Sequence, residues 1–180
     1  MINEIIKRNG VTFGILIGIF SALITAAIYT IDINLFLSLW LGISIYVLYF
    51  VLCIVLLRKT KKELNNVFSY KEAFTTYFIT VLLIIAISTL FNIILFNFID
   101  PSAKETLKEL TAKYTIEMMQ KFDAPASKIN EALTKLKDSN PYSTIELLKG
   151  SLYSIVFSSI IGLFMAAFFK SNTPTSQDYK

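Results

Sequence analysis

The sequence predicts an all-α integral membrane bundle of four transmembrane helices, with a helical extracytoplasmic segment between the third and fourth spans. Two observations predict it: 54% of the 180 residues are hydrophobic, and these residues are gathered into long runs. About 20 apolar residues are enough for a helix to cross a hydrocarbon core of roughly 30 Å. None of the four runs contains Asp, Glu, Lys, Arg or His, and they cover residues 11–31, 35–57, 76–99 and 150–169.

Burial inside a soluble protein is the alternative explanation for such runs. Four uncharged runs in so short a chain leave no polar shell to surround them, so this alternative is disfavoured. We therefore treat residues 1–180 as a single membrane domain, with residues 100–149 as an extracytoplasmic helical insertion.

The first two spans are separated by only Asp32, Ile33 and Asn34, which predicts an antiparallel hairpin. A cleaved signal peptide is the alternative for the first run, with Lys7 and Arg8 as its charged region. The run is longer than the 7–15 apolar residues of a typical signal peptide, and a second apolar run follows at once. We therefore expect the first run to remain as a span.

A basic loop follows the second run, and its bases are Arg58, Lys59, Lys61 and Lys62. Because Lys and Arg near membrane spans concentrate on the cytoplasmic side, both termini are predicted to be cytoplasmic. The same residues can contact anionic lipid head groups. A nucleic-acid surface is not expected, since no platform of aromatic and basic residues accompanies them.

Residues 100–149 are predicted to form two helices. Asp100-Pro101 ends the third span, because proline cannot continue a helix. Apolar residues then recur at spacings of three and four, which predicts an amphipathic helix over 102–122 and a second over 126–137. These helices either pack on each other as a connector, lie on the membrane surface, or bind a partner.

Small residues recur every four positions along two of the spans. This spacing lets helix backbones approach closely, either within one chain or between copies in a homo-oligomer. The candidates for helix packing or an oligomer interface are Gly10, Gly14, Gly18 and Ala22 along the first helix and Ser154, Ser158, Gly162 and Ala166 along the fourth.

The third span carries polar side chains at Thr80, Ser88 and Asn92. An amide in hydrocarbon needs a hydrogen-bond partner, so we expect Asn92 to face another helix. If these three residues lined a wet, continuous cavity, transport of a solute would be favoured; a dry, packed bundle would favour an accessory role.

The residue types present argue against an enzyme and against a bound cofactor or metal. The chain has no histidine, which removes Ser-His-Asp and Cys-His catalysis and the commonest metal ligand. We find no glycine-rich phosphate loop, and no span carries an Asp, Glu, His, Lys or Arg such as ion-coupled transporters use. We therefore predict no catalytic, cofactor-binding or metal-binding residues.

Short motifs at both ends of the third span resemble a known family. Phe68, Ala73 and Phe74 precede the span, and it closes with Asn97, Ile99, Asp100 and Pro101. In these motifs the chain resembles the bacterial membrane proteins grouped as the domain of unknown function 4199 family. The resemblance implies a multi-pass protein of the bacterial inner membrane with four spans, and it implies no activity.

The function expected from these observations is that of a non-enzymatic accessory or scaffold protein. It would bind itself or another membrane or envelope protein, through the external helices or the small-residue ridges. The alternative is a small channel or transporter of a neutral or lipid-like solute, for which the polar face of the third span would be the pathway.

Overall fold

The computed structural model describes residues 2–138 and 140–171, and these residues form helices joined by short connections. The prediction of an all-α chain is confirmed, and four of the helices are long and apolar enough to cross a membrane. The four are α1 (Glu4–Ile31), α2 (Leu39–Glu63), α3 (Tyr70–Ile94) and α6 (Thr144–Phe169). Two more helices, α4 (Pro101–Lys121) and α5 (Ala126–Asp138), lie between α3 and α6.

Each long helix begins at a side chain that caps it. Asn3 accepts a hydrogen bond from a backbone N–H at the start of α1, and Ser38, Ser69 and Ser143 do the same for α2, α3 and α6. Capping satisfies N–H groups that have no partner inside the helix. Helices α1 and α6 begin at Glu4 and Thr144, several residues before their uncharged runs, because the polar residues that precede each run are also helical.

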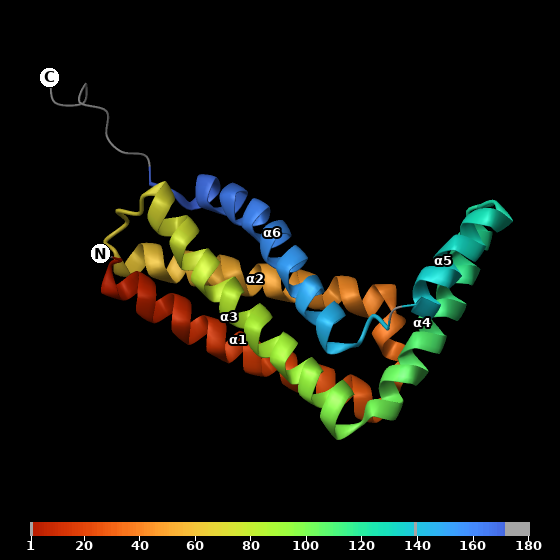
Figure 1. Ribbon diagram of the computed structural model, residues 1–180. Coiled ribbons are helices and arrows are strands. Elements are labelled where there is room, and N and C mark those ends of the chain that lie inside the picture. The colour runs from red at the N-terminus through yellow and green to blue at the C-terminus, as the bar shows by residue number, and fades with distance from the viewer. Residues whose placement is uncertain (1, 139, 172–180) are drawn as a thin grey trace, which may run out of the picture.

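Helix α3 lies at the centre of the bundle, with α1 on one side and α6 on the other (Figure 1). The contact with α1 is close because Gly10, Gly14 and Gly18 face α3. A Cβ atom on Gly14 would lie 2.8 Å from Cβ of Leu83, closer than two such atoms approach. Helix α6 approaches in the same way at Gly162, where a Cβ would lie 2.6 Å from the ring of Tyr77.

Helix α2 is attached to the others mainly at one end. Its buried residues are Cys53, Leu56, Leu57 and Thr60, all in its second half. Its first half is much more open, and the side chain of Trp40 is 82% exposed. A 3₁₀ helix, Ile33–Leu37, connects α1 to this open half. The second span was predicted to begin at residue 35, but α2 begins at Leu39 because the 3₁₀ helix occupies the first predicted residues.

Helices α4 and α5 pack on each other and form a hairpin that projects beyond the bundle (Figure 1). A five-residue π-helix, Leu95–Ile99, ends α3, and Asp123 makes the turn of the hairpin with a left-handed φ of 52°. We call this the hairpin end. The opposite end, with the start of α1, the loop between α2 and α3 and the end of α6, we call the basic end.

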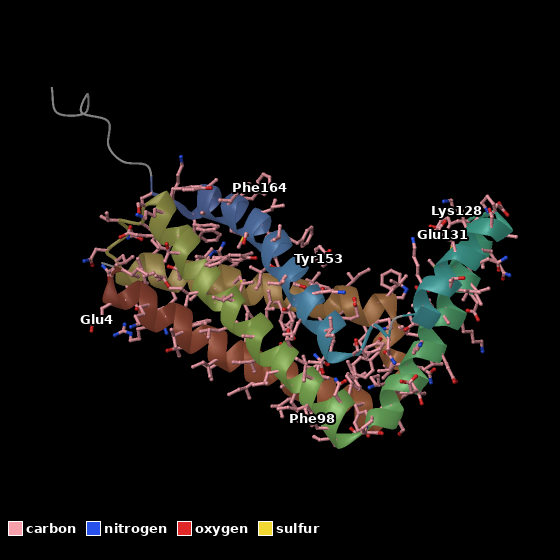
Figure 2. All side chains as sticks on the ribbon, in the orientation of Figure 1. Glu4, Phe98, Lys128, Glu131, Tyr153 and Phe164 are labelled. Atoms are coloured by element: carbon pink, nitrogen blue, oxygen red, sulfur yellow. The ribbon has the colours of Figure 1, made fainter. Side chains whose placement is uncertain are left out.

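The outer surface of the four long helices is apolar. Figure 2 shows Tyr153 and Phe164 pointing outward from α6, and their side chains are 76% and 65% exposed. Leu16 and Leu23 on α1 are similarly exposed. Apolar surface on this scale is rare on soluble monomers, so a hydrocarbon environment is the consistent explanation.

Candidate functional site

A cleft of about 600 Å³ lies among the four long helices, on the side where α2 stands apart. We call it the side cleft. It extends from Phe36 and Pro141 near the hairpin end to Cys53 and Tyr77 deep in the bundle. Aliphatic and aromatic side chains form most of its wall. Its polar lining residues include Ser21, Thr25, Tyr46, Tyr49, Ser88, Thr89, Asn92, Ser151, Ser154 and Ser158.

A group of hydrogen-bonded polar side chains forms one wall of the side cleft. The hydroxyl of Ser88 on α3 lies 2.9 Å from that of Ser21 on α1. The amide nitrogen of Asn92 donates to the backbone oxygen of Ser88 at 2.8 Å. The sequence favoured a partner for Asn92 on another helix, but the amide nitrogen instead bonds to a carbonyl one turn earlier in α3. Asn92 is also one of the residues that line the side cleft.

Thr80 does not line the side cleft, although the sequence grouped it with Ser88 and Asn92. It is fully buried between α1 and α3, where its hydroxyl lies 3.1 Å from the backbone oxygen of Gly10 and 2.9 Å from that of Thr76. Gly10 allows this contact because it brings the two backbones together. Thr80 therefore belongs to the packed half of the bundle, and Ser88 and Asn92 belong to the open half.

Apolar clusters lie at the two ends of the side cleft. Toward the basic end, Cys53 and Tyr77 pack with Met165 and with Phe68, which is fully buried. Toward the hairpin end, the rings of Phe36 and Tyr142 pack on Phe96 with centroid distances of 5.7 and 5.5 Å. Between these clusters, α2 and α6 have few contacts with each other, and both contribute residues to the wall of the cleft.

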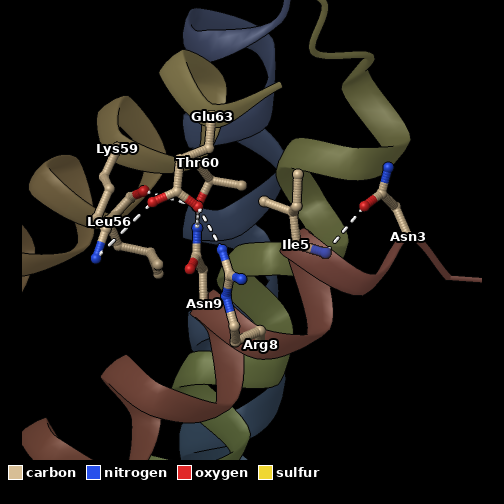
Figure 3. A network of polar contacts seen from close by, with 8 residues as sticks. All are labelled: Asn3, Ile5, Arg8, Asn9, Leu56, Lys59, Thr60 and Glu63. Carbon is tan, nitrogen blue, oxygen red and sulfur yellow. Dashed lines mark hydrogen bonds and ion pairs between the residues drawn. The ribbon is translucent and has the colours of Figure 1, made fainter. Parts of the chain in front are cut away.

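A polar network fastens α2 to α1 at the basic end (Figure 3). The amide nitrogen of Asn9, which is only 3% exposed, donates to Oγ1 of Thr60 at 3.2 Å and to Oε2 of Glu63 at 2.8 Å. Arg8 forms an ion pair with the same carboxylate at 3.1 Å. We call these four residues the α1–α2 clamp. It fixes the end of α2 that borders the closed end of the cleft.

The predicted basic residues lie at the basic end, in the last turns of α2. Lys59 lies 4.0 Å from Glu63 and stands over the ring of Phe13 at 5.3 Å from its centroid. Arg58 and Lys62 are exposed, and Lys61 is half-buried. Part of this positive charge therefore serves the attachment of α2 to α1.

The two predicted small-residue ridges have different surroundings along their lengths. Gly10, Gly14 and Gly18 contact α3, whereas Ala22 lines a shallow apolar groove beside α3. On α6, Gly162 and Ala166 are buried against the bundle. Ser154 and Ser158 instead line the side cleft. The small residues of α6 thus permit close packing at one end and leave space at the other.

The motif at the end of α3 builds the junction with the hairpin. Pro101 is the first residue of α4, and the Asp100 carboxylate accepts hydrogen bonds from the N–H groups of Ser102 and Ala103. The hydroxyl of Ser102, then that of Tyr29 and the Ala103 N–H, lower the pKa of Asp100 to about 2. The amide nitrogen of Asn97 lies 3.3 Å from the backbone oxygen of Tyr142, while Ile99 is exposed.

Sequence reasoning missed Asn9 and Glu63, which lie 54 residues apart in the chain. In the sequence, Asn9 and Glu63 are polar residues near the end of an apolar run, and such residues are usually exposed to solvent. One signal was available in the sequence. Asn9 directly precedes Gly10, the first residue of the small-residue ridge, and a residue beside such a ridge lies close to a neighbouring helix.

The described residues thus define a multi-pass α-helical protein of membrane-spanning type, with an open cleft at one side of the bundle. The chain belongs to the family described as protein of unknown function (DUF4199), whose model matches residues 12–171. The predicted family membership is confirmed. No curated protein and no solved structure matches the chain.

Proposed function

We propose that this chain is a membrane protein that binds an uncharged, lipid-like solute in the side cleft. One observation carries the proposal: a cavity of about 600 Å³ beside α2 combines apolar walls with hydroxyl and amide groups at mid-span. Small-molecule sites usually have volumes of roughly 300–1,000 Å³, apolar walls and a few polar groups. A polar group at membrane depth needs a hydrogen-bond partner, which a bound solute can supply.

The charge of the lining favours an uncharged solute. Among the described residues that line the cleft, Glu146 is the only Asp, Glu, Lys, Arg or His. It lies near the hairpin end and forms an ion pair with Lys149 at 2.7 Å. No guanidinium or ammonium group is among those lining residues to neutralise a phosphate or carboxylate. Burying an unpaired charge in such a site would cost far more than burying a hydroxyl.

The open side of the cleft supports entry from the bilayer. Tyr46 on α2 and Phe157 on α6 line the cleft and are also 75% and 64% exposed at the surface of the bundle. The apolar cluster around Cys53 and Phe68 stands between the cleft and the basic end. A molecule dissolved in the membrane can enter between α2 and α6 without crossing that cluster. This favours a binding protein or carrier over an open channel.

Photoaffinity labelling of the full chain in lipid nanodiscs tests the proposal. The probe is a neutral single-chain lipid that carries a diazirine on its alkyl chain. We expect labelled peptides from the α2 and α6 segments that line the cleft, and we expect excess unlabelled lipid to suppress that labelling. Labelling spread evenly over outward residues such as Leu16 and Leu23, with no suppression, would contradict the proposal.

An accessory or scaffold role is the second candidate, and the projecting hairpin favours it. Lys128 and Glu131 on α5 lie far from the bundle (Figure 2), and Phe122 at the turn is 78% exposed. A connector of this length is often functional. Cross-linking through the lysines of residues 104–137 in native membranes tests this role. Reproducible links to one distinct membrane or envelope protein would support it, and links confined to this chain would contradict a stable complex.

The location and orientation proposed here rest on charge and family. We propose a bacterial inner-membrane protein with the basic end in the cytoplasm and the hairpin outside, because juxtamembrane Lys and Arg favour the cytoplasmic side. Partners are then the bilayer, the solute and either a second copy or another membrane protein. Neither proposed role requires catalysis, a cofactor or a nucleic acid.

A further inference from the structure

The orientation of the Asn92 amide is fixed by chemistry. Its nitrogen donates to the backbone oxygen of Ser88 at 2.8 Å, and a carbonyl oxygen can only accept. The Asn92 oxygen must therefore point the other way. It accepts no hydrogen bond from another described residue. Every buried side-chain oxygen in the described chain has a partner, so this oxygen borders open space, and Asn92 lines the side cleft.

Two of the three serines of α6 that line the cleft, Ser151 and Ser154, also have their donors engaged. The hydroxyl of Ser151 donates to the backbone oxygen of Leu148 at 2.7 Å, and that of Ser154 donates to Gly150 at 2.9 Å. A serine that donates to its own helix keeps lone pairs that can accept. These two serines on α6 and Asn92 on α3 thus offer acceptors to the same cavity.

We infer that Asn92 selects solutes whose polar group is a hydrogen-bond donor, namely a lipid alcohol or a lipid with an amide N–H. This inference rests on the proposed function and narrows its solute class. A donor would pair with the Asn92 oxygen. An ether, ester or ketone has no donor for the Asn92 oxygen and would bring a second acceptor against it, which is unfavourable.

Binding of two matched probes tests the inference. Hexadecanol and its methyl ether share one alkyl chain, and methylation removes only the donor and adds one carbon. Native mass spectrometry of the full chain released from detergent gives the occupancy of each. We expect the alcohol to be preferred about fivefold, the ratio that one neutral hydrogen bond supports.

Two variants, each with one asparagine changed to leucine, test whether Asn92 is the residue that selects the alcohol. Asn92→Leu removes the acceptor and keeps a side chain of similar volume. It should reduce the preference for hexadecanol over its methyl ether to the ratio set by the partitioning of the two probes alone. Asn97→Leu is the matched control, because Asn97 does not line the cleft and its amide nitrogen instead lies 3.3 Å from the backbone oxygen of Tyr142. It should retain the full preference of the wild-type chain.

The outcomes separate this inference from the proposed function. Equal binding of both probes to the wild-type chain would overturn the selection of donors while leaving a lipid site in place. A preference that persists in Asn92→Leu would overturn the role of Asn92. If neither probe bound, the proposed function itself would fail. The comparison of the two probes on the wild-type chain tests the selection of donors even if Asn92→Leu does not fold.

Discussion

The hydroxyl of Tyr29, near the end of α1, donates a 2.7 Å hydrogen bond to Oδ2 of Asp100, the residue that caps α4. The bond joins two residues 71 positions apart and connects the first long helix to the base of the hairpin. The direction of the hairpin is therefore fixed by α1 as well as by α3.

Removal of this hydroxyl should loosen the base of the hairpin. In Tyr29→Phe, Asp100 loses one of its hydrogen-bond donors, so we expect faster amide hydrogen exchange in α4 and little change in the long helices. Tyr70→Phe is the control, because Tyr70 is exposed and lies at the start of α3, at the basic end away from the hairpin. Unchanged exchange in α4 of Tyr29→Phe would show that the bond does not hold the hairpin.

The same carboxylate predicts a pH dependence. Hydrogen bonds from Ser102, Tyr29 and Ala103 lower its pKa from 3.8 to about 2 in the folded chain. A lowered pKa contributes stability that is present above the unfolded value and is lost as the pH falls through the folded value. We expect the α4 base to loosen between pH 3.8 and about 2. Carbon-13 NMR titration of Asp100 measures the midpoint, which should rise in Tyr29→Phe.

The close approach of α1 to α3 predicts that Gly14 tolerates no side chain. A Cβ there would lie 2.8 Å from Leu83, so Gly14→Val should destabilise the fold by about 1–3 kcal/mol through overpacking. Gly42→Val is the matched control, because a Cβ on Gly42 meets nothing within 4 Å. Unfolding in mixed detergent micelles compares the two, and equal loss of stability would contradict the close helix contact.

The α1–α2 clamp predicts a role for Asn9 in holding α2. Asn9→Leu removes the donor to Thr60 and Glu63, and we expect it to cost about 1 kcal/mol of stability. Arg8→Ala should cost less, because its ion pair is exposed to solvent. Thermal unfolding of the purified chain measures both. A larger effect for Arg8→Ala would mean that charge, and not the buried amide, fastens α2.

The proposed orientation predicts different access to the two ends of the bundle. In a chain with Cys53→Ser, cysteine is placed singly at Lys62 in the basic end or at Lys113 in the hairpin. A membrane-impermeant thiol reagent should label Lys113→Cys in intact cells, and Lys62→Cys only after lysis. The reverse pattern would place the basic end outside.

The long helices could be predicted from the sequence because each run of uncharged residues exceeds the length of a span. Residues 102–122 and 126–137 were also close to the observed α4 and α5, since helical periodicity and proline positions are local signals. The side cleft could not be predicted. It arises because α2 is held by contacts near Cys53 and Thr60 but not near Trp40, and such contacts depend on how distant segments pack.

The polar residues of α3 show the same limit. Thr80 and Ser88 have similar side chains in one apolar run, yet one is sealed against Gly10 and the other lies beside a cavity. The difference depends on the neighbouring helices, which approach α3 closely at glycines and stand away elsewhere. A periodic pattern identifies a polar face but does not show which part of it is open.

Filling the side cleft from α6 would decide whether it is a ligand site. Gly150 lines the cleft and a Cβ there meets nothing within 4 Å, so Gly150→Leu should add bulk to the cleft wall without disturbing the helices. Ala167→Leu adds a side chain on the exposed surface of the same helix. We predict that neutral lipid retained by the purified chain, measured by native mass spectrometry, falls in Gly150→Leu and is unchanged in Ala167→Leu. Equal retention in wild type and both variants would contradict binding in the side cleft.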